Sequence, residues 1–336
     1  MNVVELKNLR KSFALKRGGL FNRTTTEVTA VAGIDLIVQP GESVAFIGPN
    51  GAGKSTTIKI LTGIMRPTSG SAQVLGLVPW RDRTKLATRI GAVFGQRSQL
   101  WYHLPALDSF ELLSRIYNLD KNKYKARRDM LIERFALQPF LNTPVRKLSL
   151  GQRMRAEIAS SLLHSPEVLF LDEPTIGLDV VARQELRDLM REWNRDEGLT
   201  VFLTSHDAGD IEHVARRVVV INNGQVMLDD TVSTVKRRYL GQKIIGARFH
   251  EQPGTFDMEG VTELKRSEYA VKLIVDTEKT DIDRVAAAIL HAGSVADITI
   301  EDPPLEDVIA RMYGDQRNGD QRNGTEKASQ TGADAK

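Results

Sequence analysis

The sequence contains no cysteine among its 336 residues. The chain can therefore form no disulfide, no thiolate metal site and no cysteine nucleophile, and we expect a reducing compartment. Long apolar runs are also missing, because no stretch approaches the roughly 20 residues that a membrane-spanning helix needs. The first ten residues lack the apolar core and the cleavage site of a signal peptide. These absences predict that the protein acts at a membrane only from the cytosol and through a partner.

An excess of charge of one sign is missing as well. The chain has 46 basic and 43 acidic residues, which gives a net charge of +3. A nucleic-acid partner is not expected, since such binders usually show a clustered basic face. The densest basic run is KNKYKARR at 121–128, and we interpret it as a solvated helix face rather than a nucleic-acid or lipid contact.

Short apolar runs bounded by turn signals recur along the first two thirds of the chain. Runs of this kind are typical of buried strands in a mostly parallel sheet that helices cover on both faces. They predict an α/β fold class. The runs are Val44–Ile47, Val168–Leu171, Val201–Thr204 and Val218–Ile221.

The periodicity changes twice along the chain. Between Gln96 and Leu148 it becomes helical, which predicts a helical subdomain at about 97–150 within a domain of residues 1–238. Beyond Leu240, residues 268–277 alternate as a half-buried strand does, with a helix behind a capping Thr280 or Asp281 and then another strand, Val295–Ile300. This predicts a small α+β domain at 241–313. The polar tail at 314–336 is expected to be disordered. The residues predicted on the buried face of the first strand are Tyr269, Val271, Leu273 and Val275.

The strongest motif is the glycine-rich loop GPNGAGKST, which follows a buried strand and precedes a helix-periodic segment. Its glycines let backbone N–H groups turn toward phosphates, and the helix adds its positive end to that anion site. Lys54 is expected to reach the β- and γ-phosphates of a nucleotide, and the Ser55 hydroxyl is expected to hold Mg²⁺. The predicted nucleotide-binding residues of this loop are Gly48, Pro49, Asn50, Gly51, Ala52, Gly53, Lys54, Ser55 and Thr56.

Two acidic residues follow the buried run in VLFLDEP. Asp172 stands at the carboxyl end of that strand, where doubly wound sheets bind their ligands, and is expected to act on Mg²⁺. Glu173, one residue beyond, is placed to polarise an attacking water as a general base. The motif LSLGQ opens a later helix-periodic stretch, and Ser149 in it has the residue type of a helix cap.

Together these motifs resemble the ATPase subunit of an ABC transporter over about residues 1–235. The resemblance implies a P-loop NTPase fold, with a RecA-like core, an antiparallel β-subdomain and the inserted helical subdomain. LSLGQ resembles the family signature LSGGQ, so the resemblance implies that Ser149, Gly151 and Gln152 contact the nucleotide of an opposite subunit. Leu150 departs from the signature, where the family usually has a second glycine.

The resemblance assigns four more positions. Gln96 matches the glutamine that links Mg²⁺ and the attacking water to the helical subdomain. Asp179 matches the aspartate of the loop at the dimer interface, and His206 matches the histidine that touches the γ-phosphate. Phe13 occupies the place of the aromatic that stacks on adenine, although the insertion that follows it is longer than the family usually has.

One chain carries one phosphate loop and one signature, so the resemblance implies a head-to-tail dimer with a second ATPase subunit, identical or different, that binds ATP and Mg²⁺. It also implies a membrane-spanning permease and a place at the cytoplasmic face of the membrane. The apolar group Trp101, Tyr102, Leu104 and Leu107 is expected either to dock on that permease or to form the subdomain's own core.

The sequence is most similar to single-cassette ATPases of drug, lipid or polysaccharide exporters, with import-type ATPases as an alternative. An ABC ATPase without a transport role is a further alternative. The compact stretch between Gln96 and Ser149 argues against the repair and chromosome types, which insert a long coiled coil there.

Overall fold

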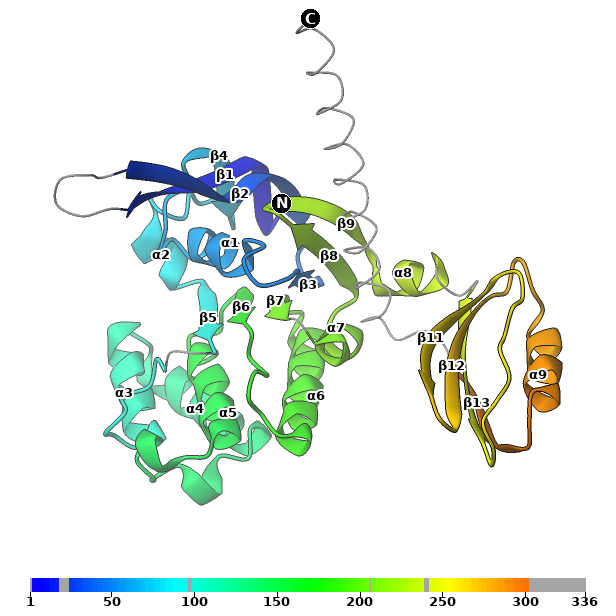
Figure 1. The fold of residues 1–336 in the computed structure, drawn as a ribbon. Helices are drawn as coiled ribbons and strands as arrows, with labels where there is room; N and C mark the ends of the chain where they lie inside the picture. The colour runs from blue at the N-terminus through cyan, green and yellow to red at the C-terminus, as the bar shows by residue number, and fades with distance from the viewer. Residues whose placement is uncertain (1, 18–23, 96–97, 206, 239–241, 302–336) are drawn as a thin grey trace, which may run out of the picture. The chain divides into compact units, whose positions relative to one another are not determined.

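The computed structural model describes residues 2–17, 24–95, 98–205, 207–238 and 242–301 (Figure 1). The chain divides into two compact units, Met1–Val232 and Ser233–Lys336. We call them the N-terminal unit and the C-terminal unit and describe each by itself. No helix in the described ranges is long and apolar enough to cross a membrane.

A six-stranded sheet forms the centre of the N-terminal unit, in the order β5-β6-β7-β3-β8-β9. Its first five strands run parallel, and β9 pairs antiparallel with β8 across a turn at Asn223 and Gly224. The four apolar runs that the sequence singles out all lie in this sheet, which confirms the predicted α/β class. The strands are β3 (Ser43–Ile47), β5 (Ile90–Phe94), β6 (Val168–Asp172), β7 (Thr200–Ser205), β8 (Arg217–Asn222) and β9 (Gln225–Thr231).

An antiparallel sheet in the order β2-β1-β4 accompanies the parallel one. Its strands are β1 (Val4–Arg17), β2 (Thr24–Val38) and β4 (Ser69–Val74). One hydrophobic core joins the two sheets and helix α1 (Lys54–Leu61), with Leu6 from β1, Phe46 from β3 and Ile58 from α1 all fully buried. This shared core fixes the start of α1 against the ends of the parallel strands. The short helix α2 (Arg83–Ala87) precedes β5.

The helical subdomain follows β5 (Figure 1). Its helices are α3 (Ala106–Ile116), α4 (Lys121–Arg134) and α5 (Leu150–Ser161), with 3-10 turns η1 (Gln138–Phe140) and η2 (Val145–Lys147) between α4 and α5. Helices α6 (Val180–Glu197) and α7 (Ala208–Val214) alternate with the last parallel strands. In α4 the three lysines are exposed while Tyr124 is buried, as a solvated face requires.

The apolar group at the start of the subdomain divides between surface and interior. Trp101 is 38% exposed and Tyr102 is 53% exposed, whereas Leu104 and Leu107 are half-buried. The interior of the subdomain uses other side chains, among them the fully buried Phe110. The two aromatic residues are therefore surface residues of this chain rather than its core.

The C-terminal unit is a four-stranded antiparallel sheet in the order β11-β12-β10-β13, with helix α9 (Ile282–His291) packed on one face. The strands are β10 (Gln242–Phe249), β11 (Val261–Ser267), β12 (Ala270–Asp276) and β13 (Val295–Glu301). Helix α8 (Val232–Arg238) spans the boundary between the two units.

Two details of the C-terminal unit differ from the sequence prediction. Tyr269 is 50% exposed and lies in the turn before β12, so its predicted place on the buried face is wrong, whereas Val271, Leu273 and Val275 are buried there. The predicted side-chain cap of α9 is also absent. Asp281 holds the cap position without a side-chain hydrogen bond, and Thr280 instead donates to the Glu259 carbonyl.

Candidate functional site

The glycine-rich loop turns from β3 into α1 at the carboxyl end of the parallel sheet. Gly53 precedes the helix with φ of 105°, and a Cβ there would lie 2.4 Å from the Ala30 carbonyl oxygen. Only glycine fits this left-handed and crowded position. The turn aligns the first N–H groups of α1 toward the space above the sheet, as an anion site requires.

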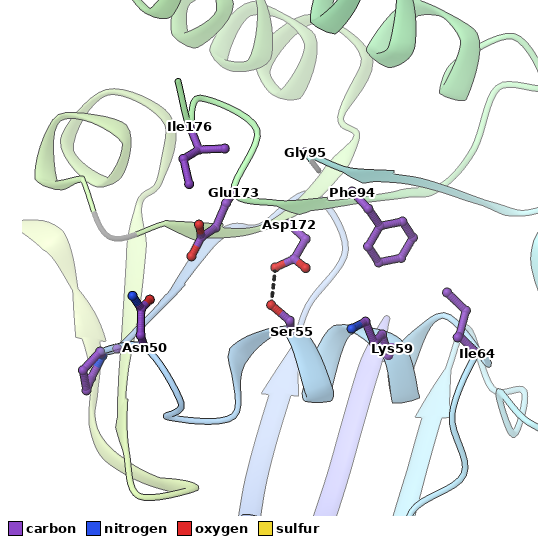
Figure 2. A pocket seen from close by; sticks show the side chains of 11 residues that line it. Asn50, Ser55, Lys59, Ile64, Phe94, Gly95, Asp172, Glu173 and Ile176 are labelled. Carbon is purple, nitrogen blue, oxygen red and sulfur yellow. Dashed lines mark hydrogen bonds between the residues drawn. The ribbon is translucent and has the colours of Figure 1, made fainter. Parts of the chain in front are cut away.

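Asp172 connects three segments at this end of the sheet. Its Oδ1 accepts a hydrogen bond of 3.0 Å from Ser55 Oγ at the start of α1, as Figure 2 shows, and one of 2.7 Å from Thr204 Oγ1 on β7. The strand order places β6 beside β7, so the carboxylate at the end of β6 lies within hydrogen-bond distance of Thr204 as well as Ser55. The hydroxyl and the carboxylate predicted to act on Mg²⁺ therefore lie together.

Lys54 lies beneath the loop. Its Nζ donates to the carbonyl oxygens of Gly48 at 2.6 Å and Pro49 at 3.2 Å, and it lies 3.8 Å from Glu173 Oε1. Burial lowers the pKa of this ammonium, while the charges of Glu173 and Asp172 act in the opposite direction. The predicted phosphate-binding cation and the predicted general base are thus neighbours.

Glu173 has an unusual backbone. Its φ is 52°, in the left-handed region that residues other than glycine seldom adopt, and its N–H donates to the Thr204 carbonyl oxygen and to Thr204 Oγ1, both at 3.1 Å. Such strain is typical of residues whose side chain must be directed into a functional site. Here the turn directs the Glu173 carboxylate toward the phosphate loop (Figure 2).

These residues surround a cavity of about 770 Å³, which is large enough for a nucleotide-sized ligand. One side of it is polar and is formed by the phosphate loop, Asp172 and Glu173; the other side includes apolar side chains (Figure 2). The lining residues are Gly48, Pro49, Asn50, Ser55, Lys59, Ile64, Phe94, Gly95, Asp172, Glu173 and Ile176.

The sequence did not single out several of these lining residues. Gly95 is the clearest, because a Cβ there would lie 2.5 Å from the Glu173 carbonyl oxygen, so β5 can approach the strained turn only with glycine. Its place directly before Gln96 in VFGQ was the available signal. Ile64 and Phe94 carry no such signal, since isolated apolar residues are usually core.

The LSLGQ motif lies away from the cavity lining. Ser149 caps α5, its Oγ accepting from the Gln152 N–H at 3.2 Å while the Gln152 side chain accepts from the Ser149 N–H at 3.0 Å, which forms a capping box. Ser149 is exposed. Gly151 lies beside α6, where an added Cβ would meet the Ala182 side chain at 2.9 Å. The cap predicted from the sequence is confirmed.

Asp179 caps the neighbouring helix α6, and its Oδ1 accepts from the Ala182 N–H at 2.8 Å. The two residues that follow it are apolar but exposed, Val180 at 81% and Val181 at 68%. Exposed apolar pairs at a helix start are typical of surfaces that a partner covers.

The remaining predicted site residues are Phe13, Gln96 and His206. Phe13 lies on β1, paired with Val28 of β2, and the Lys11 ammonium lies 5.2 Å from its ring centre. Phe13 is not among the residues that line the cavity. Gln96 and His206 lie outside the residues that the structure describes.

The donor set at this site suits Mg²⁺. A serine hydroxyl and a carboxylate are the hard oxygen ligands that Mg²⁺ prefers, and the ion usually takes its remaining ligands from water and substrate phosphates. Ser55 and Asp172 supply these two protein oxygens 3.0 Å apart at the edge of the cavity.

Comparison with known proteins supports a common origin for this arrangement. The family described as "ABC transporter" matches residues 31–176. The daunorubicin resistance ATP-binding protein DrrA3 of Streptomyces coeruleorubidus is 34% identical over 294 residues, which cover 86% of this chain and 92% of that protein. The linearmycin resistance ATP-binding protein LnrL of Bacillus subtilis (strain 168) is 27% identical over 320 residues, covering 93% and 98%.

A solved structure agrees with these sequence relatives. The ATP-binding cassette MJ0796, in a dimeric post-hydrolysis state bound to ADP and Pi, has a TM-score of 0.59 and 27% sequence identity. The match covers 68% of this chain and 98% of that chain.

Proposed function

Because the chain belongs to the family of ABC transporter ATP-binding proteins and hydrolyses ATP, we propose that it works as one half of a head-to-tail dimer that drives a separate membrane permease. One observation carries this proposal. At the carboxyl end of the parallel sheet, Ser55, Asp172 and Glu173 line one cavity beside the phosphate loop. We assign this cavity to the triphosphate of ATP.

The residues divide the reaction among them. The loop N–H groups and the Lys54 ammonium hold the phosphates. Ser55 and Asp172 would hold Mg²⁺, which when bound would neutralise charge on the phosphate oxygens. Glu173 accepts a proton from the water that attacks the γ-phosphorus. The strained turn at Glu173 and its hydrogen bonds to Thr204 keep that carboxylate directed toward the phosphates.

A second chain completes the site. Ser149 and Gly151 lie away from the cavity of their own chain, so we assign them, with Gln152, to the nucleotide held by the partner. Asp179 and the exposed Val180 and Val181 form the surface that this partner covers. ATP between the two chains then closes the dimer, and its hydrolysis allows the dimer to open.

The same family pattern assigns Gln96 and His206 to the reacting phosphate and Phe13 to adenine. These three roles rest on the order of the motifs along the chain. For Phe13 the position on β1 beside the Lys11 ammonium leaves its ring half-buried, with part of its surface free for stacking.

We assign export as the direction of transport, with a drug-like compound as the substrate. The relatives named for daunorubicin and linearmycin resistance match this chain over most of its length, the C-terminal unit included. The small C-terminal unit is thus a shared part of these proteins rather than an addition to the cassette.

The role of Glu173 is tested by Glu173→Gln. The variant keeps the size of the side chain but cannot accept the proton, so hydrolysis should fall by roughly 10²–10⁴ while ATP binding persists. Steady-state phosphate release and binding of a fluorescent ATP analogue measure the two effects. Near-normal turnover in this variant would remove Glu173 from the role of base.

We assign the exposed aromatic pair at the start of the helical subdomain as the surface that docks on the permease. Trp101 and Tyr102 lie on the surface, and Leu112 and Ile116, one turn apart on α3, are 39% and 65% exposed. Apolar side chains at such exposure are typical of protein interfaces.

Trp101→Ala should therefore leave the ATPase rate of the isolated chain within about twofold of wild type, because the variant loses no contact at the cavity and surface substitutions usually change stability little. It should reduce co-purification with the permease and drug export from cells. Loss of folding in this variant would instead show that Trp101 belongs to the subdomain's own core.

A further inference from the structure

A buried carboxylate on α5 lies where the catalytic sheet meets the helical subdomain. Glu157 is only 3% exposed and is eight residues after Ser149, about 12 Å along the helix axis. It lines no part of the nucleotide cavity. A buried ionised side chain is costly unless donors satisfy it, so its partners indicate its task.

The hydrogen-bond donors that the structure describes for the Glu157 carboxylate lie in the segment that follows Gln96. Ser98 Oγ donates to Oε1, and the Gln99 N–H donates to both carboxylate oxygens, at 3.2 and 3.0 Å. The backbone of Leu100 adds a third donor. Burial raises the pKa of Glu157, and these donors, with the charge of Arg153 one turn earlier, act against that rise.

The same short segment is fixed to the sheet. The Gln99 side-chain amide donates to the Ala92 carbonyl oxygen on β5. Residues 98–100 are therefore held from two sides, by β5 of the nucleotide-binding sheet and by α5 of the helical subdomain. They stand between Gln96, assigned to the reacting phosphate, and Trp101, assigned to the permease.

We propose that Glu157 is a positioning residue, whose carboxylate couples the segment after Gln96 to the signature helix α5. A movement of α5 toward a partner's nucleotide then carries residues 98–100 with it, and through them both Gln96 and the aromatic docking pair. This inference rests on the proposed function, because it gives Gln96 and Trp101 the roles assigned above. Glu157→Ala keeps a good helix former on α5 but removes the carboxylate that accepts from Ser98, Gln99 and Leu100.

The test is steady-state hydrolysis by the full chain with Glu157→Ala, Glu157→Gln, Ser98→Ala and the Ser98→Ala/Glu157→Ala double variant. Glu157→Ala should lower kcat by about tenfold to a hundredfold, the effect expected for losing hydrogen bonds to a charged group. The KM for ATP should stay within about twofold, because no phosphate-loop contact involves Glu157.

Glu157→Gln and Ser98→Ala should fall between Glu157→Ala and wild type, since each keeps part of the hydrogen-bond set. The double variant should lose no more than Glu157→Ala alone, because both changes break the same interaction. If Glu157→Ala does not fold, Glu157→Gln and Ser98→Ala decide the question, since Ser98 is an exposed side chain.

Ser161→Ala is the matched control. Ser161 is also a buried polar residue of α5, but its hydroxyl donates only to the Ile158 carbonyl of its own helix, at 2.7 Å. This variant should keep the wild-type kcat within about twofold. An equal loss in Ser161→Ala, a wild-type kcat in Glu157→Ala, or a rise in KM at constant kcat would overturn the proposal.

Glu173→Gln, measured in parallel, separates this inference from the proposed function. If Glu173→Gln turns over normally, the catalytic assignment fails whatever Glu157 does. If Glu173→Gln is inactive and Glu157→Ala is normal, only the positioning role fails.

Discussion

Two glycine-containing motifs begin helices in the N-terminal unit, and they differ in what surrounds them. At the phosphate loop, Lys54 is buried and Ser55 is hydrogen-bonded to Asp172 on another strand. At the start of α5, Ser149 is exposed, and among the described residues its side chain hydrogen-bonds within its own capping box. The first motif is built into the fold, and the second is presented on the surface.

The difference fits the division of work that we propose for one chain. A residue that must hold a charged phosphate needs a fixed and partly dry surrounding, which the sheet ends supply. A motif that acts on a partner's nucleotide must instead be free to meet it. Substitutions at the first motif should therefore disturb both chemistry and packing, whereas substitutions at the second should disturb chemistry and lower stability only by the small amount that a helix cap contributes.

The largest expected effect comes from mixing two inactive variants. Lys54→Ala removes the phosphate-binding cation, and Ser149→Arg blocks the signature, so each variant alone should lose roughly 10²–10³ in hydrolysis. In a head-to-tail pair of the two variants, one site combines the intact Lys54 of one chain with the intact Ser149 of the other. The mixture should recover up to about a quarter of wild-type activity, since random pairing makes half of the dimers mixed.

Phosphate release by the two variants, separately and mixed in equal amounts, measures this recovery. Lys54→Ala mixed with Glu173→Gln is the control, because both changes affect the same side of the site and no intact site can form. A Lys54→Ala and Ser149→Arg mixture that stays inactive would show that a second copy of this chain does not complete the site.

Much of the fold could be predicted because its signals are local. The run Val44–Ile47 and the loop after it specify a strand, a turn and a helix within about fifteen residues, and β3, Gly53 and α1 appear where expected. The cap at Ser149 is equally local. Alternation alone was less reliable at strand ends, since Tyr269 fits the alternating pattern but stands in the turn before β12.

The supporting contacts of the site could not be predicted. In the sequence, nothing distinguishes Glu157 from an exposed glutamate of a helix, and its partner Ser98 lies 59 positions earlier. Asp210 likewise follows a histidine motif with nothing to mark it, yet it is fully buried and joins three segments. Such contacts depend on the packing of distant segments, which residue types and periodicity do not specify.

A smaller effect is expected on stability. It contrasts the buried Asp210 with the exposed Ser149 of the signature. Asp210 accepts from Arg187 Nε at 2.7 Å, from Ser205 Oγ at 2.6 Å and from Thr175 Oγ1. Asp210→Ala leaves a buried guanidinium without this partner, so the free energy of unfolding should fall by about 3–5 kcal/mol. Ser149→Ala should cost only about 1 kcal/mol, the usual effect of losing a helix cap.

Denaturant titration of both variants measures this difference. Asp210→Asn serves as the control for shape, since it keeps the size of the side chain and part of the hydrogen bonding. Equal losses at positions 210 and 149 would contradict the contrast between the fixed interior and the free surface.

The smallest effect concerns the anchored end of α5, opposite its exposed start. His164 follows that helix, donates from Nε2 to the Ile90 carbonyl of β5 at 2.9 Å and stacks on Tyr117 with ring centres 4.2 Å apart. Burial lowers the pKa of His164 below its usual 6.5, and the charge of Arg127 lowers it further. The hydrogen bond to the Ile90 carbonyl acts in the opposite direction. The folded state therefore binds this proton less readily than the unfolded state does.

The sign of the pH dependence follows from that difference. The stabilisation by neutral His164 is fully present above about pH 6.5 and is lost as the pH falls through the lower folded-state value. Denaturant titrations from neutral to mildly acidic pH should show the unfolding free energy of wild type falling more steeply than that of His164→Gln, whose side chain does not titrate. Because His164 holds α5 to β5, the acidic loss should appear in the helical subdomain first, as faster amide exchange in α5 than in α1. Equal slopes for the two proteins would mean that the anchored end of α5 does not depend on the neutral imidazole.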